Sequence, residues 1–279
     1  MNKKEWTITP HYRLSDFDFK VIWHYRYLLC QLIHRDVVAF YKQTVLGPLW
    51  FFIQPLFSTT IYTLIFGTFA KVSTDGLPQP LFYLAGIITW NYFSECINKT
   101  SLVFRENVNI FGKVYFPRII VPLGIVISVF IRFGIQFILF LTCLIIYNCI
   151  GHELSINWAI GLFPLLVLLM ALQGLGMGMI IAALTVKYRD LIFLISFGLQ
   201  LLMYTTTVIY PLSTAPLNLK WIIQINPMTA IIETFRYAFL GRGSFSWQAL
   251  CYSTAITTII ISIGIIVFSK AEKTFIDTI

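Results

Sequence analysis

"IIVPLGIVISVFIRFGIQFILFLTCLIIYNC", residues 119–149, contains a single charged side chain, Arg132. An α-helix rises about 1.5 Å per residue, so about 20 apolar residues are enough to cross the roughly 30 Å hydrocarbon core of a bilayer. The stretch is therefore predicted to span a membrane as a helix. It is longer than the minimum, which predicts that the helix tilts or projects beyond the bilayer.

The rest of the chain has the same character. Hydrophobic residues make up 58% of the 279 residues, charged residues make up 11%, and the mean hydropathy is +0.79. Soluble domains have roughly a quarter of their residues charged, so this chain has too little polar surface for a water-soluble protein. The fold class predicted is an all-α polytopic membrane protein with a single transmembrane domain covering residues 1–279.

Six apolar runs are predicted to be transmembrane helices. They cover residues 47–70, 80–100, 119–149, 157–184, 191–211 and 249–269. The first run opens with Gly47-Pro48, a helix-start signal, and contains Pro55, which is expected to kink or loosen the helix. The polar start of the chain has no apolar core followed by a cleavage site, so no signal peptide is predicted.

The distribution of Lys and Arg predicts the orientation. Fifteen of these residues flank one side of the predicted spans and four flank the other. Positive charge is enriched in cytoplasmic loops, so both termini and the segment 105–118 are predicted to be cytoplasmic. The basic residues lie in short segments beside the spans and form no extended basic face, which excludes a nucleic-acid partner.

Two regions are predicted to lie at the membrane without spanning it. Residues 16–44 place apolar side chains at helical spacing between charged ones, which indicates an amphipathic interfacial helix. Residues 212–242 are apolar but contain Lys220, Glu233 and Arg236, and Asn226-Pro227 is a helix-cap signal. This second region is predicted to form a re-entrant helical hairpin on the outer face, before the last span.

The sequence lacks the residues for a nucleotide or metal site. Its Gly112-Lys113 pair is followed by valine and has no upstream glycine of the G-x-x-x-x-G-K-[ST] motif. The five cysteines are scattered and form no C-x-x-C pair, so neither a disulfide framework nor a metal centre is predicted. Any ATP-driven activity therefore requires a second polypeptide, and this chain is predicted not to be an enzyme.

Ionisable groups at membrane depth are costly and usually face a partner, a cavity or a path. Arg132 is a candidate contact for an anionic substrate or a lipid headgroup, or a structural bond to a neighbouring helix. Glu233 and Arg236 are three residues apart and can pair on one helix face, either to hold the hairpin together or to contact substrate. A lone Glu95 is weak support for proton coupling.

Aromatic residues make up 16% of the chain, and most are expected in lipid-facing belts or in packing. Flat rings can also stack on sugar faces along a pore. The candidates on the first two spans are Trp50, Tyr62, Trp90, Tyr92 and Phe93. Gly174, Gly178 and Ala182 recur at four-residue spacing, which favours close helix packing within the chain, with a dimer face as the alternative.

Four stretches in the same order resemble the permease subunits of type-2 ABC exporters of cell-surface polysaccharide, the O-antigen, teichoic acid and capsule family. They are "RDVVAFYKQTVLGPLWFFIQPL" (35–56), "NVNIFGKVYFPR" (107–118), "VKYRDL" (186–191) and "INPMTAIIETFRYAFLG" (225–241). The resemblance covers nearly the whole chain. It implies a homodimeric channel in the bacterial inner membrane, flanked by two P-loop ATPase subunits that bind ATP and Mg. The implied cargo is a polysaccharide of the O-antigen type, linked to a polyprenyl diphosphate.

The same resemblance assigns roles to residues. Residues 106–116 would form the coupling helix, within the coupling segment 105–118. The ATPase-coupling residues it implies are Glu106, Asn107, Phe111, Lys113, Tyr115, Arg189 and Asp190. Arg26 and Arg35 on the interfacial helix would lie where a lipid diphosphate approaches. Pro227, Glu233 and Arg236 would belong to the outer gate. Two alternatives remain open, a type-2 ABC exporter of a small lipid or drug and an ion-driven flippase that uses Glu95 or Glu233.

Overall fold

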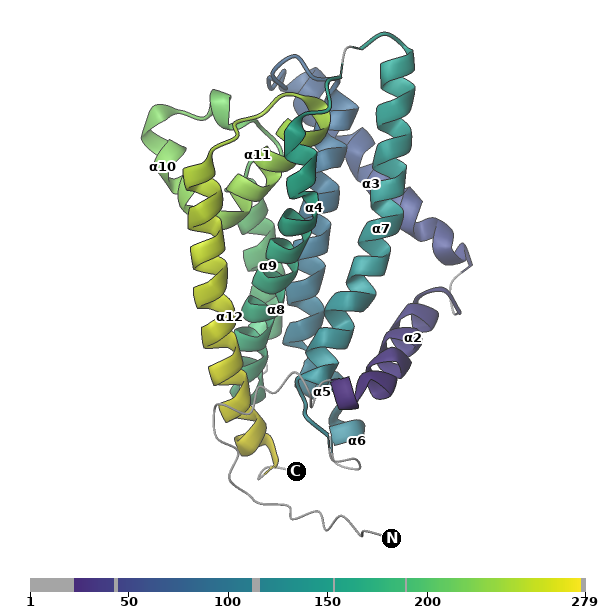
Figure 1. Cartoon of the computed structure of the whole chain (residues 1–279), viewed down its shortest axis with the longest axis vertical. Helices are drawn as coiled ribbons and strands as arrows, with labels where there is room; N and C mark the ends of the chain where they lie inside the picture. The colour runs from purple at the N-terminus through teal and green to yellow at the C-terminus, as the bar shows by residue number, and fades with distance from the viewer. Residues whose placement is uncertain (1–22, 43–44, 112–115, 153, 189, 277–279) are drawn as a thin grey trace.

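The computed structural model describes residues 23–42, 45–111, 116–152, 154–188 and 190–276, and within these ranges the chain is helical and contains no β-strand (Figure 1). The long helices run side by side as a bundle. The short helices α5 (Val103–Glu106) and α6 (Val108–Phe111) lie at one end, and α10 (Leu217–Ile225) and α11 (Pro227–Leu240) lie near the other. Helix α2 (Arg26–Lys42) packs beside α7 (Ile120–Cys149), close to α5 and α6.

Four helical segments among the described residues are long and apolar enough to cross a membrane. They are Gly47–Phe69, Ile120–Cys149, Trp158–Lys187 and Trp247–Glu272. The first comprises a short 3-10 turn, α3 (Trp50–Tyr62) and a π-helical stretch, Thr63–Phe69, and the last belongs to α12 (Trp247–Ile276). The chain is therefore a multi-pass helical membrane protein.

Helix α4 (Gln79–Ser101) has 23 residues but is less apolar, because it contains Asn91, Glu95, Asn98 and Lys99. It lies at the centre of the bundle and packs against α3, α7, α11 and α8 (Phe163–Lys187). Polar groups at membrane depth are stabilised when protein groups, not lipid, surround them. The most polar of the long helices is therefore the one with most of its surface covered by other helices.

The small residues of α8 allow this close packing. A Cβ atom on Gly174 would lie 2.5 Å from the Cβ of Cys96, and one on Gly178 would lie 2.5 Å from the Cβ of Thr100. On another side of α8, a Cβ on Gly264 of α12 would lie 2.7 Å from the carbonyl oxygen of Gly176. These glycines of α8 therefore allow close helix packing within the chain.

Helix α3 contains Pro55 and continues as an α-helix to Tyr62, and irregular π-helical turns begin at Thr63. One helix boundary differs from the sequence expectation. Helix α9 (Leu191–Tyr204) ends at Tyr204, whereas the predicted apolar run extended to residue 211. Residues 206–209 are buried without being helical, so apolar sequence continues there after the helix has ended.

Candidate functional site

A cluster of ionic side chains links α4 and α7 inside the bundle. Arg132 donates a hydrogen bond from Nη1 to Oε1 of Glu95, and Nζ of Lys99 lies 3.8 Å from the same oxygen. Arg132 is only 5% exposed, and its guanidinium lies 5.8 Å from the ring centroid of Phe51 on α3. The side chain proposed to contact substrate is therefore engaged in an ion pair between two helices of its own chain.

The aromatic candidates do not lie together on one surface. Trp90, Tyr92 and Phe93 are buried in the core around α4, where the ring centroids of Tyr92 and Phe133 are 5.0 Å apart. Trp50 is 48% exposed at the start of α3. Tyr62 lies at the end of α3 and donates its hydroxyl hydrogen to the sulfur of Met203 on α9, over 3.7 Å. In this structure the three α4 rings pack inside the chain.

The end of the bundle with α5 and α6 is anchored to α2. Arg35 donates from Nη1 to Oδ1 of Asn107 over 3.2 Å, and Asn107 donates from Nδ2 to the carbonyl oxygen of Val103 over 3.0 Å. Arg35 also pairs with Asp36 at 2.9 Å. Asn107 is buried, whereas Glu106 is exposed on the same short segment. The predicted coupling residue Asn107 thus faces the protein, and Glu106 faces away from it.

An aromatic cluster fixes the same end to α12. The ring of Phe111 lies 6.0 Å from both Phe104 and Phe116, and the ring of Phe104 stacks on Phe268 at 4.8 Å. Arg118 lies over Phe111 and donates from Nη1 to the carbonyl oxygen of Glu272 over 3.0 Å. Burial lowers the pKa of Arg118 from its ordinary value, and the carboxylate of Glu272 counteracts this shift.

The remaining predicted residues of this end are not brought together. Lys113, Tyr115 and Arg189 lie outside the described residues. Asp190 is exposed directly before α9. Arg26 is exposed near the start of α2 and donates from Nη1 to the carbonyl oxygen of Trp23 over 3.3 Å, whereas Arg35 contacts Asn107 and Asp36.

The opposite end contains a buried ion pair on α11. Arg236 donates from Nη1 to the carbonyl oxygen of Thr207 and from Nη2 to those of Val208, at 2.8 Å, and Phe82, at 3.3 Å. Its guanidinium lies 3.6 Å from the ring centroid of Phe82. The bonds to Thr207 and Val208 satisfy carbonyl groups of the non-helical chain after α9, which buried irregular backbone requires, and the bond to Phe82 ties this chain to α4.

The carboxylate of Glu233 completes this network. Oε2 accepts hydrogen bonds from the backbone nitrogen of Ser244 at 3.0 Å and from its hydroxyl at 3.1 Å, and Oε1 lies 3.6 Å from Nη1 of Arg236. Asn226 caps α11 by accepting from the backbone nitrogen of Met228 at 3.0 Å, with Pro227 as the first helical residue. The helix cap and the pairing of Glu233 with Arg236 were both indicated by sequence spacing.

Several residues of these networks were not identified from the sequence. Lys99 follows Glu95 by four residues, a spacing that could have indicated their pairing. Phe82 and Ser244 carry no such signal, because their contacts with Arg236 and Glu233 depend on how distant segments fold together. The contact between Arg118 and Glu272 likewise joins residues far apart in the chain.

Comparisons with known proteins cover most of the chain. The sequence profile described as ABC-2 type transporter matches residues 27–240. An O-antigen export system permease protein RfbA from Klebsiella pneumoniae is 27% identical over 252 residues, which are 90% of this chain and 94% of the relative. The RfbA protein of Myxococcus xanthus is 26% identical over 92% of this chain and 97% of its own length. The capsule polysaccharide export inner-membrane protein CtrC of Neisseria meningitidis is 22% identical over 87% of this chain and 90% of its own length. The profile match extends over more than half of the sequence, and the chain belongs to the ABC-2 type transporter family.

Proposed function

We propose that this chain is the channel-forming permease subunit of an ABC exporter that moves a lipid-linked polysaccharide of the O-antigen type across the bacterial inner membrane. The observation that carries the proposal is its similarity, over nine-tenths of its length, to O-antigen export permeases. Energy comes from a separate subunit that binds ATP and Mg. The cargo is a glycan attached to a polyprenyl diphosphate.

The proposed topology has six spans. The four long apolar segments, α4 and α9 cross the membrane, with both termini and α5–α6 on the cytoplasmic side. The excess of Lys and Arg beside that end supports this orientation. α10 and α11 then form the re-entrant outer hairpin, whose buried Arg236 and Glu233 hold non-helical backbone that lipid could not solvate.

The working unit is a homodimer whose path lies between two copies. Support comes from α3 and α9, which expose large apolar side chains and touch each other through Tyr62 and Met203. Phe57 is 65% exposed on α3, and Phe193 and Phe197 are 82% and 60% exposed on α9. Pairing of these faces would place their aromatic side chains against the second copy in place of lipid.

The ATPase docks on α5 and α6. Arg105, Glu106 and Val108 are exposed there, whereas Asn107 and Phe111 are anchored to α2 and the aromatic cluster. A displacement of this segment by the partner would therefore reach α2 through Arg35 and α12 through Phe268. These contacts would transmit the displacement from the docking surface to the rest of the helix bundle.

The ion-driven alternative has less support. It needs a carboxylate that gains and loses protons, and both Glu95 and Glu233 lie against arginine side chains. Each carboxylate is therefore already engaged in an ion pair within the chain.

The test uses a host strain that depends on this chain. Its depletion is expected to remove the polysaccharide from the cell surface and to cause lipid-linked polymer to accumulate inside. Depletion of the cognate ATPase should give the same result, which separates the proposal from an ion-driven flippase. Normal surface polysaccharide after depletion of the chain would overturn the proposal, and loss of a small lipid alone would favour the drug or lipid exporter.

A further inference from the structure

A narrow groove with a volume of about 210 Å³ lies between α3, α4 and α7. The residues that line it include Thr60 of α3, Leu64 of the π-helical stretch that follows, Leu81 and Leu84 of α4, and Cys143 and Tyr147 of α7. Its accessible lining is almost entirely apolar. A dry apolar cavity of about 150 Å³ is large enough to bind benzene, so this groove has room for a segment of a hydrocarbon chain.

The groove is open toward the surface of the bundle. Leu56 and Leu64 on its α3 side are exposed, whereas Leu81 and Leu84 on its α4 side are buried. The segment Gly47–Phe69, which contributes the exposed side, is the least covered of the four long apolar segments described. The groove is therefore continuous with a helix surface suited to the hydrocarbon core of a bilayer, where lipid chains are the molecules that contact it.

The backbone beside the groove departs from a regular α-helix. The π-helical stretch Thr63–Phe69 begins among the lining residues, and π-helical turns are rare and occur mostly at functional sites. A Cβ atom on Gly67 would overlap the side-chain amide of Gln79 at the start of α4. The glycine thus lets the end of α3 approach α4 next to Pro80, which also lines the groove.

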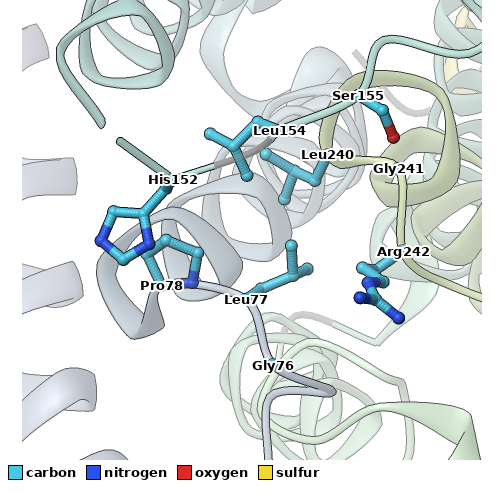
Figure 2. A pocket seen from close by; sticks show the side chains of 9 residues that line it. All are labelled: Gly76, Leu77, Pro78, His152, Leu154, Ser155, Leu240, Gly241 and Arg242. Atoms are coloured by element: carbon cyan, nitrogen blue, oxygen red, sulfur yellow. The ribbon is translucent and has the colours of Figure 1, made fainter. Parts of the chain in front are cut away.

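The surroundings become polar at the α10–α11 end of the groove. The ring centroids of Tyr147, a lining residue, and His152 are 5.6 Å apart. His152 and Pro78 belong to the wall of a separate cavity of about 420 Å³, whose accessible lining is mostly polar (Figure 2). The change from apolar to polar follows the order of hydrocarbon core and headgroups in a bilayer. A lipid chain in the groove would therefore have its polar end toward this cavity.

We propose that the groove binds one acyl chain of a membrane phospholipid, with the headgroup toward the α10–α11 end. The chain covers Leu81 and Leu84 and lies between α3 and α7, so lipid completes the packing of these two helices. Phospholipid is the source because the groove opens on the lipid-exposed surface. Tyr62, which contacts α9 on the face proposed for the dimer, is not among its described lining residues. Binding needs no transport, so it is tested separately from the proposed function.

The test is photo-labelling of the full chain in vesicles of phosphatidylethanolamine and phosphatidylglycerol. The probe is a phosphatidylethanolamine that carries a diazirine in one acyl chain, and mass spectrometry identifies the labelled residues. Leu56 and Leu64, which are 40% and 51% exposed, are expected to be labelled at least fivefold more than Ile259 and Ile263 of α12, which are 53% and 46% exposed. Equal labelling of the two pairs would show that the groove holds lipid no better than an ordinary helix surface, and would overturn the proposal.

Competition identifies the kind of chain. A small fraction of a polyprenyl phosphate added to the same vesicles is expected to leave the labelling of Leu56 and Leu64 unchanged. A fivefold loss of this labelling would mean that the groove prefers the branched polyprenyl chain, and the assignment to a phospholipid would be wrong.

Two matched variants locate the site. Thr60 and Thr142 are both exposed, and each hydroxyl donates to the carbonyl oxygen four residues earlier over 2.9 Å. Thr60 lines the groove, and Thr142 is not among its described lining residues. Thr60→Trp is expected to fill the groove and to lower the labelling of Leu56 and Leu64 to that of the α12 pair, whereas Thr142→Trp should be labelled as the wild type is.

The unfolding temperature of both variants should equal that of the wild type, because both positions are exposed. Equal labelling of the two folded variants would contradict the proposal. If Thr60→Trp does not fold, the comparison of Leu56 and Leu64 with Ile259 and Ile263 in the wild type still decides the question.

Discussion

Glu233 and Arg236 lie one turn apart on α11, with 3.6 Å between Oε1 and Nη1, and their side chains are 3% and 1% exposed. Arg236 reaches three carbonyl groups from two other parts of the chain, and Glu233 reaches Ser244. The pair therefore joins four segments at the end of the bundle.

Removing Arg236 should be strongly destabilising. Arg236→Met leaves a buried carboxylate and three carbonyl groups without their cation, a change that typically costs about 3–5 kcal/mol. Glu233→Gln should cost less, because Arg236 keeps its carbonyl acceptors. Unfolding in detergent, followed by circular dichroism, measures both; a stability of Arg236→Met equal to that of wild type would contradict the proposed role.

Glu95 and Arg132 are expected to be energetically coupled. The stability changes of Glu95→Gln, Arg132→Met and the double variant form a thermodynamic cycle. Since the two side chains are in direct contact, the coupling energy should be about 0.5–3 kcal/mol. Additive changes would mean that the contact contributes nothing to the packing of α4 on α7.

Gly174 and Gly134 provide a matched pair of helix glycines. Gly174→Ala places a methyl group 2.5 Å from the Cβ of Cys96, and such overpacking typically costs about 1–3 kcal/mol. Gly134 has no neighbour within 4 Å of its added Cβ, so Gly134→Ala should be neutral or stabilise α7 by about 0.5–1 kcal/mol. Thermal unfolding distinguishes these two results. Equal effects would show that α8 and α4 can separate freely.

Substitution of Glu106 is expected to weaken binding of the ATPase subunit and to leave the stability of the fold unchanged. Glu106→Lys changes an exposed charge on the surface proposed to contact the ATPase, so co-purification of the two subunits and polysaccharide export should fall while the unfolding temperature stays the same. Lys220→Glu, an opposite change of equal size on α10, is the control. Retained co-purification and export of the Glu106→Lys protein would argue against docking at α5.

The exposed face of α3 and α9 should cross-link between copies. In a variant without native cysteines, Phe57→Cys and Phe197→Cys are each expected to give dimers with a short bismaleimide. Ile266→Cys is the control because it is 42% exposed on α12, which packs mainly against α8 and α11. Dimers from the control alone would place the interface elsewhere.

Sequence reasoning succeeds where one physical effect dominates. The run 119–149 is so apolar that only a membrane helix can bury it, and α7 occupies residues 120–149. Likewise, Asn226 and Pro227 are residue types that begin a helix. The three-residue spacing of Glu233 and Arg236 places both side chains on one helix face.

Contacts between distant segments could not be predicted in this way. Val208 and Ile209 are as apolar as a helix interior, but α9 has already ended, and Arg236 supplies the hydrogen bonds that a helix would otherwise make. Glu95 and Arg132 stand 37 positions apart, so only the packing of α4 on α7 reveals their bond. Trp90, Tyr92 and Phe93 are aromatic residues of a kind that fits a pore or a core equally well, and their burial places them in the core of the chain.

The shortness of α9 has a consequence for its role as one of the six proposed spans. Its 14 residues extend about 21 Å at 1.5 Å per residue, against roughly 30 Å of hydrocarbon. A helix shorter than the bilayer draws the two headgroup layers toward each other. If α9 crosses the membrane as proposed, the hydrocarbon layer would be thinner where lipid meets this helix, and a charged lipid headgroup that crossed there would have a shorter distance to travel away from water.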